Sequence, residues 1–93
     1  MVFKMLFLAD YIEDVDRKKF NIPDGRIIYY TKVFFDYDFL RRCHCVKLSV
    51  TYSANINSYT KSLWFTQDNF LKYYRKCENY QRFKKLSKIN NAA

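Results

Sequence analysis

Residues 43–53 read CHCVKLSVTYS, and this stretch decides the fold because apolar and polar side chains alternate through it more cleanly than anywhere else. Successive side chains of a β-strand point to opposite faces of a sheet, so the alternation predicts an antiparallel strand with one buried face. The side predicted to face the core carries His44, Val46, Leu48, Val50 and Tyr52. The rest of the chain must supply the neighbouring strands and a layer that covers this side.

Strand-forming residues lie on both sides of that stretch. Residues 26–39 are dense in Ile, Val, Phe and Tyr, and we expect a strand there that bends at 40–42 into the central strand. A polar loop at 54–58 leads to a further expected strand at 59–65. The apolar run at 2–9 has the length of a strand buried on both faces, although so short a run also fits a buried helix. The sheet is therefore predicted to have about four antiparallel strands.

The C-terminal part of the chain has the pattern of one long amphipathic helix. Thr66 or Asp68 is the expected N-cap, because a side-chain oxygen there can accept a free amide of the first turn. We expect the helix to run to about Leu86 and the ordered domain to comprise residues 1–88, with a frayed tail at 89–93. The apolar face of this helix is predicted to carry Phe70, Tyr73, Tyr74 and Cys77.

A second, shorter helical element is expected earlier in the chain. Residues 10–20 are polar, with a few apolar positions at helical spacing. Asp10 is the expected cap of a short helix or turn, and Glu13 three residues later would complete a capping box. The stretch NIPDG at 21–25 follows as the clearest turn. Together these features predict a single small α+β domain whose long C-terminal helix packs on the sheet.

The composition is that of a folded domain. Among 93 residues, 49% are hydrophobic and only one is Gly and one Pro, which excludes disordered and collagen-like classes. No apolar run approaches the roughly 18 residues of a membrane span. Lys4 and Asp10 break the N-terminal run, so we expect neither a signal peptide nor a membrane partner. Three cysteines form an odd number that suits a reducing compartment, and a cytoplasmic location is predicted.

Positive charge is concentrated toward the C-terminus. The net charge is +8, and residues 68–93 hold seven basic and two acidic side chains. A helix with this charge suits a polyanion, above all nucleic acid. The same charges would also suit a solvated helix face that serves solubility. The residues expected to contact nucleic acid or another partner are Lys72, Arg75, Lys76, Arg82, Lys84, Lys85, Arg41, Arg42 and Tyr80.

Aromatic residues are unusually frequent at 20% of the chain, and many of them alternate with basic residues. Cations that follow phosphates and rings that stack on bases together bind single strands, so single-stranded or structured RNA is the favoured ligand. Nine tyrosines cannot all be buried with satisfied hydroxyls, so some are expected at the surface. Exposed Tyr and Arg also favour protein interfaces, and a nucleoprotein or an acidic protein surface is the other partner class.

No catalytic or metal-binding motif stands out. Cys43 and Cys45 would lie on one face of the central strand and His44 on the other, which disfavours a zinc site and predicts a partly buried histidine. Asp36 and Asp38 would share a face but match no catalytic motif. A single glycine excludes a glycine-rich phosphate loop. We therefore predict no cofactor, no metal and no enzymatic activity.

The leading hypothesis is a non-enzymatic basic domain that binds nucleic acid or a nucleoprotein. One alternative is a protein-binding inhibitor or adaptor of a phage or virus, such as an anti-defence or anti-CRISPR-like factor in host cytoplasm. The small size and the many residues with AT-rich codons are compatible with that origin. A small ribonuclease toxin that uses His44 is the minor alternative. A homodimer through an uncovered sheet face or edge is compatible with each of these.

Overall fold

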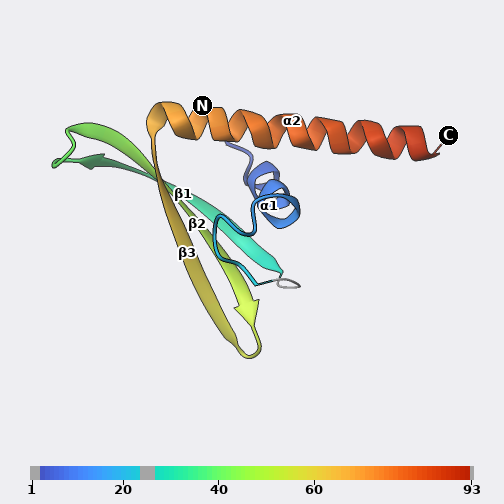
Figure 1. Ribbon diagram of the computed structural model, residues 1–93, viewed down its shortest axis with the longest axis horizontal. Coiled ribbons are helices and arrows are strands. Elements are labelled where there is room, and N and C mark those ends of the chain that lie inside the picture. The colour runs from blue at the N-terminus through green and yellow to red at the C-terminus, as the bar shows by residue number, and fades with distance from the viewer. Residues whose placement is uncertain (1–2, 24–26, 93) are drawn as a thin grey trace.

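The computed structural model describes residues 3–23 and 27–92, which form two helices and a three-stranded antiparallel sheet. The strands pair in the order β1-β2-β3, so each hairpin joins neighbours in the sheet. The predicted α+β class is confirmed. In chain order the elements are α1 (Met5–Asp14), β1 (Ile28–Asp38), β2 (Cys43–Ala54), β3 (Asn57–Thr66) and α2 (Gln67–Ala92) (Figure 1).

The central strand β2 directs the predicted apolar residues toward the helices, but its burial does not alternate as predicted: Cys45, Ser49 and Thr51, on the other face, are buried as well. Val46, Leu48 and Val50 are fully buried and Tyr52 nearly so, and they form one core with residues of both helices. Helix α1 packs against α2 and β1, while α2 also contacts β2 and β3. Over the part of the chain that the structure describes, both helices thus cover the same face of the sheet and leave the other face without a helix.

Short loops connect the strands where turns were expected. The β1–β2 loop spans residues 39–42, and the β2–β3 loop consists of Asn55 and Ile56. Arg42 and Asn55 have φ angles of 52° and 59°, in the left-handed region that reverses the chain within few residues. The expected bend at 40–42 and the polar loop within 54–58 are both confirmed.

The N-terminal segment differs from the prediction, and the sheet has three strands rather than four. Most of the apolar run at 2–9 belongs to α1. The buried residues of this helix have helical spacing, since Leu8 and Ile12, four residues apart, are both fully buried. Met, Leu and Ala are strong helix formers, and the segment contains neither Gly nor Pro. Residues 1–2 lie outside the described part of the chain. A short apolar run fits a buried strand or a buried helix, and tertiary packing decides between them.

The expected helix at 10–20 is also corrected, because α1 begins earlier. Asp10 lies inside α1, and turns follow at 15–21. The Glu13 carboxylate accepts the backbone N–H of Ile28 at 2.8 Å, so it anchors the start of β1 instead of closing a capping box. The backbone N–H of Lys4, just before α1, donates to the Tyr74 hydroxyl at 2.9 Å. Two residues of the expected turn, 24 and 25, lie outside the described part of the chain.

Helix α2 begins as expected and extends further than expected. The backbone N–H of Asn69 donates to the Thr66 hydroxyl oxygen at 3.3 Å, which identifies Thr66 as the N-cap. The predicted apolar face is buried, and its residues are Phe70, Tyr73, Tyr74 and Cys77. The helix continues to Ala92, past its expected end near Leu86. Its C-terminal end extends beyond α1 and the sheet (Figure 1), and the molecule measures 53 × 34 × 20 Å.

Neither helix, over the residues that the structure describes, is both long enough and apolar enough to cross a membrane.

Candidate nucleic-acid interface

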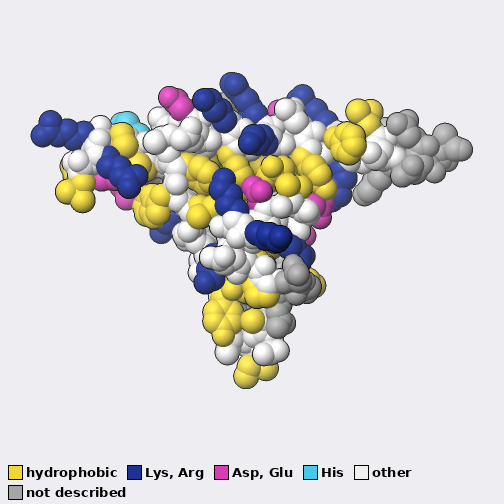
Figure 2. Space-filling view, in the orientation of Figure 1, with side chains coloured by type: hydrophobic (Ala, Val, Ile, Leu, Met, Phe, Trp, Pro, Cys, Tyr) yellow, Lys and Arg dark blue, Asp and Glu magenta, His cyan; other side chains and the backbone are white. Residues whose placement is uncertain are grey.

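Three predicted basic residues form a stripe on the outer surface of α2. Lys72, Arg75 and Lys76 are exposed, and their i, i+3, i+4 spacing places them on one side of the helix. We call these three residues the cationic ridge. Figure 2 shows basic side chains along α2 above a band of apolar surface. Within residues 3–23 and 27–87, no ion pair connects any of the three to a carboxylate.

A fourth cation, Lys19, joins the ridge from the segment that follows α1. Its Nζ lies 5.3 Å from the ring centre of Phe65 on β3 and 4.9 Å from that of Tyr73 on α2. Cation–π contacts of this kind hold a lysine over a ring while its ammonium stays accessible to anions. A surface hollow of about 350 Å³ results, which we call the lysine hollow, lined by Lys19, Phe65, Asn69, Lys72, Tyr73 and Lys76.

The groups beneath the lysine hollow are neutral at physiological pH. Burial and the nearby Asp16 carboxylate raise the pKa of the Cys77 thiol to about 12, and the same two causes raise the pKa of the Tyr73 hydroxyl. Neither group therefore ionises to offset the lysines. No acidic side chain lines the lysine hollow, and the nearest carboxylate that acts on its floor is that of Asp16, next to Tyr73.

Two of the predicted contact residues already bind inside the fold. Lys84 Nζ lies 2.8 Å from the Asp14 carboxylate, and the Tyr80 hydroxyl donates to the same carboxylate at 2.7 Å. These contacts connect α2 to the end of α1, and we call the three residues the Asp14 clamp. Hydrogen bonds from Lys84 and then Tyr80 hold the pKa of Asp14 below its usual value. Sequence reasoning did not pair these residues because 66 positions separate Asp14 from Tyr80.

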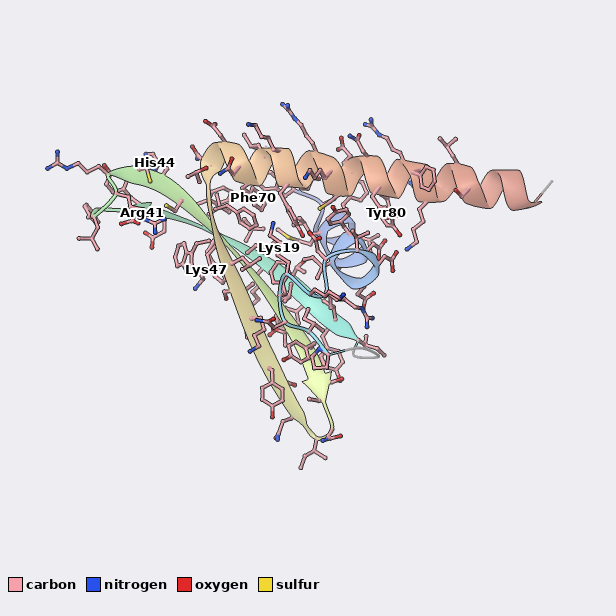
Figure 3. All side chains as sticks on the ribbon, in the orientation of Figure 1. Lys19, Arg41, His44, Lys47, Phe70 and Tyr80 are labelled. Atoms are coloured by element: carbon pink, nitrogen blue, oxygen red, sulfur yellow. The ribbon has the colours of Figure 1, made fainter. Side chains whose placement is uncertain are left out.

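The remaining predicted cations do not join the ridge. Arg82 lies 3.4 Å from Glu78 one turn away on α2, and Lys85 lines a small hollow on the side of α2 that faces α1. Arg41 and Arg42 lie in the β1–β2 loop, and Figure 3 places Arg41 at the far end of that hairpin, away from Lys19. Arg41 also forms an ion pair of 3.6 Å with Asp38.

The helix-free face of the sheet carries a second cluster that sequence reasoning found only in part. Lys47 Nζ lies 4.8 Å from the ring centre of Phe34 and 5.6 Å from that of Trp64, while Lys32 Nζ lies 5.3 Å from that of Tyr30. We call these five residues the aromatic face. The alternation of aromatic and basic residues was visible in the sequence, but the contacts of Lys47 with Phe34 and Trp64 were missed because only the strand register brings the three residues together.

The expectation that His44 is partly buried is wrong. His44 lies on the predicted side of β2 but is exposed, because β2 there extends beyond the helices. Its ring packs edge-on against Tyr37, with ring centres 5.0 Å apart.

The Asp38 carboxylate orders the β1–β2 loop, because it accepts the backbone N–H groups of Leu40 and Arg41.

The cysteines are free thiols at two separate places. Cys43 and Cys45 share one face of β2, with sulfur atoms 3.7 Å apart, and Cys77 is buried on α2. Within the described residues, no three His, Cys, Asp or Glu side chains are grouped so that they could hold a metal ion.

Comparison with known proteins returns no relative: no protein-family model, no curated protein and no solved structure matches this chain.

Proposed function

We propose that this protein is a non-enzymatic nucleic-acid-binding domain in which Lys19 and the cationic ridge contact phosphates. One observation carries the proposal. Lys19, Lys72 and Lys76 come from two separate segments and line one hollow that contains no acidic side chain. Phosphates are the dominant source of protein–nucleic acid affinity, and clustered lysines are their usual partners.

The clustered lysines lower the stability of the free protein. Like charges that folding brings together repel one another, and this repulsion weakens stability. A phosphate between them turns the repulsion into attraction and releases counterions from the nucleic acid. The Asp14 clamp offers the contrast, because Lys84 is already matched by a carboxylate. Lysines gathered without such a match favour an external anion.

The experiment removes two charges from the lysine hollow and compares the result with the removal of two charges elsewhere. We expect Lys72→Ala/Lys76→Ala to weaken binding to a short RNA about tenfold at low salt, and to reduce the slope of log K against log salt by about 1.5. The control is Lys18→Ala/Lys61→Ala, which removes two exposed lysines that do not line the lysine hollow. Fluorescence anisotropy between about 50 and 200 mM salt measures both quantities. Equal losses in the two double variants would show that net charge alone drives binding.

A second candidate function is docking on a host protein, as an inhibitor or adaptor. It is favoured by the β1–β2 loop, where Phe39 and Leu40 are 83% and 98% exposed beside two arginines. Aromatic residues and Arg are enriched in protein interfaces, so Phe39 beside the two arginines suits such a contact. In that case, association with one protein would survive nuclease treatment and be lost in Phe39→Ser/Leu40→Ser.

A further inference from the structure

We propose that the aromatic face binds the unpaired bases of a single-stranded nucleic acid, with Lys47 holding a phosphate between two stacked bases. This inference rests on the proposed function and specifies its ligand. The aromatic face lies on the opposite side of the sheet from the helices, so it forms a second contact surface besides the lysine hollow.

The strand register sets the geometry. Phe34 on β1 pairs with Lys47 on β2, and Lys47 pairs with Trp64 on β3, so the three side chains form one row across the sheet. Neighbouring strands lie about 4.8 Å apart, which places the two aromatic residues about 10 Å from each other. Bases stacked on their neighbours in a helix lie only about 3.4 Å apart. The row therefore fits bases that are splayed apart, with the backbone between them over Lys47.

The rings are open to such a ligand. Tyr30, Phe34 and Trp64 are 49%, 45% and 57% exposed, and none of them belongs to the core of the domain. Lys47 contacts both rings of the row without covering them. A flat ring that is half accessible offers the surface on which a base can stack. In a duplex the faces of each base are already covered by its neighbours, so these rings select unpaired bases.

The polar groups next to the row indicate low base specificity. The hydroxyls of Ser49 and Ser62 bind each other at 2.7 Å, and those of Thr51 and Thr60 at 3.1 Å. These pairs lie on the same side of β2 as Lys47, and their hydroxyls already have partners. Stacking is tolerant of sequence because every base has a π-face, whereas discrimination needs free donors and acceptors. We therefore expect the aromatic face to bind many single-stranded sequences.

The two contact surfaces are close enough for one ligand. Trp64 and Phe65 are consecutive residues of β3, an edge strand of the sheet; Trp64 belongs to the aromatic face and Phe65 lines the lysine hollow. A single strand that crosses the β3 edge at this point would reach both surfaces. Asp36 and Asp38 lie beyond the row toward the β1–β2 loop, and their charge disfavours a path in that direction.

The chain contains a built-in probe, because Trp64 is its only tryptophan. We expect short oligothymidylate and oligouridylate to quench the fluorescence of Trp64 to a saturable limit, whereas a duplex of equal length leaves it nearly unchanged. Phe34→Leu keeps an apolar side chain but removes the flat ring, and it should weaken single-strand binding about 5- to 150-fold, the range for one stacked base. The control is Phe83→Leu, which makes the same change at a residue of α2 that is 67% exposed.

Each outcome separates the two proposals. Single-strand binding with quenching of Trp64, weakened by Phe34→Leu and not by Phe83→Leu, supports the aromatic face. Binding that is measured by anisotropy but leaves Trp64 fluorescence and the Phe34→Leu variant unaffected overturns it and leaves the proposed function intact. Equal affinity and equal quenching for duplex and single strand also overturns it. If no nucleic acid binds at about 50 mM salt, both proposals fail and docking on a protein becomes the leading function.

Discussion

The two faces of β2 show how one strand serves two purposes. Val46, Leu48 and Val50 alternate with Lys47 and Ser49, and the first three are fully buried beneath the helices. Lys47, on the other face, is half-buried and contacts two rings that remain open to solvent. Substitutions of adjacent residues should therefore differ in effect: those of Val46, Leu48 or Val50 should alter stability, and those of Lys47 or the rings that it contacts should alter binding.

The largest loss of stability is expected from Leu48→Ala. This side chain is fully buried, so its truncation removes apolar contacts and leaves a cavity, at a cost of about 2–5 kcal/mol in the free energy of unfolding. Urea unfolding followed by circular dichroism measures the loss. Below the unfolding transition the surviving folded protein should bind nucleic acid as the wild type does. A stability loss below about 1 kcal/mol would show that the helices do not pack on this face as described.

Asp14→Ala should give a smaller loss of stability. The variant removes two hydrogen bonds, from Lys84 and from Tyr80, that connect α2 to α1. Because the group is partly exposed, we expect about 1–2 kcal/mol after discounting for solvent screening. Nucleic-acid binding should not weaken, since the substitution removes a negative charge. A loss of affinity without a loss of stability would place the Asp14 clamp in the interface.

The Asp14 clamp also predicts a dependence of stability on pH. The pKa of Asp14 is lowered in the folded protein, so the unfolded state takes up the proton first as the pH falls. The stabilisation is complete above the unfolded pKa of about 4 and is lost as the pH falls through the lower folded value. Urea midpoints should therefore fall less between about pH 5 and pH 3 in Asp14→Ala than in the wild type. Parallel curves for the two proteins would contradict the lowered pKa.

Lys47→Met should change stability little and binding clearly. An exposed cation–π contact contributes about 0.5–1 kcal/mol, and the unbranched Met side chain retains most of the apolar contact with Phe34 and Trp64. Single-strand affinity should fall several-fold and lose about 0.7 from its salt slope, the value for one phosphate contact. Anisotropy titrations at several salt concentrations measure this slope. An unchanged slope would mean that no phosphate lies over Lys47.

Local patterns predicted much of the fold from the sequence. The alternation at 43–53 identified β2, and the position of Thr66 before an amphipathic segment identified the start of α2. Both features depend on residues close together in the chain. The N-terminal segment was wrongly predicted because an apolar run of that length fits either element, and α1 is specified by distant contacts, including that of Lys4 with Tyr74.

The candidate site was predictable only where it lies on one helix. Lys72 and Lys76 were identified from helical periodicity, and the structure keeps them together. Lys19 was missed because its position depends on packing against Phe65 and Tyr73, which lie far away in the sequence. For the same reason, periodicity could not distinguish Lys84, which is bound to Asp14, from the lysines of the ridge. Charge can be counted from a sequence, but the partner of each charge depends on the tertiary fold.

The two faces of the sheet should also differ in the reactivity of their thiols. Cys77 is fully buried on the apolar face of α2 with its pKa raised to about 12, whereas Cys43 lies on the helix-free side of the sheet and is only half-buried. Since the thiolate is the reactive form, iodoacetamide at about pH 8 should label Cys43 in the folded protein long before Cys77. Mass spectrometry of peptides after timed labelling measures both rates, and Asp14→Ala should accelerate labelling of Cys77 because it loosens α2. Equal rates for the two thiols in the wild type would mean that α2 detaches from the sheet in the native state, and the helix-covered face would then be no more protected than the other.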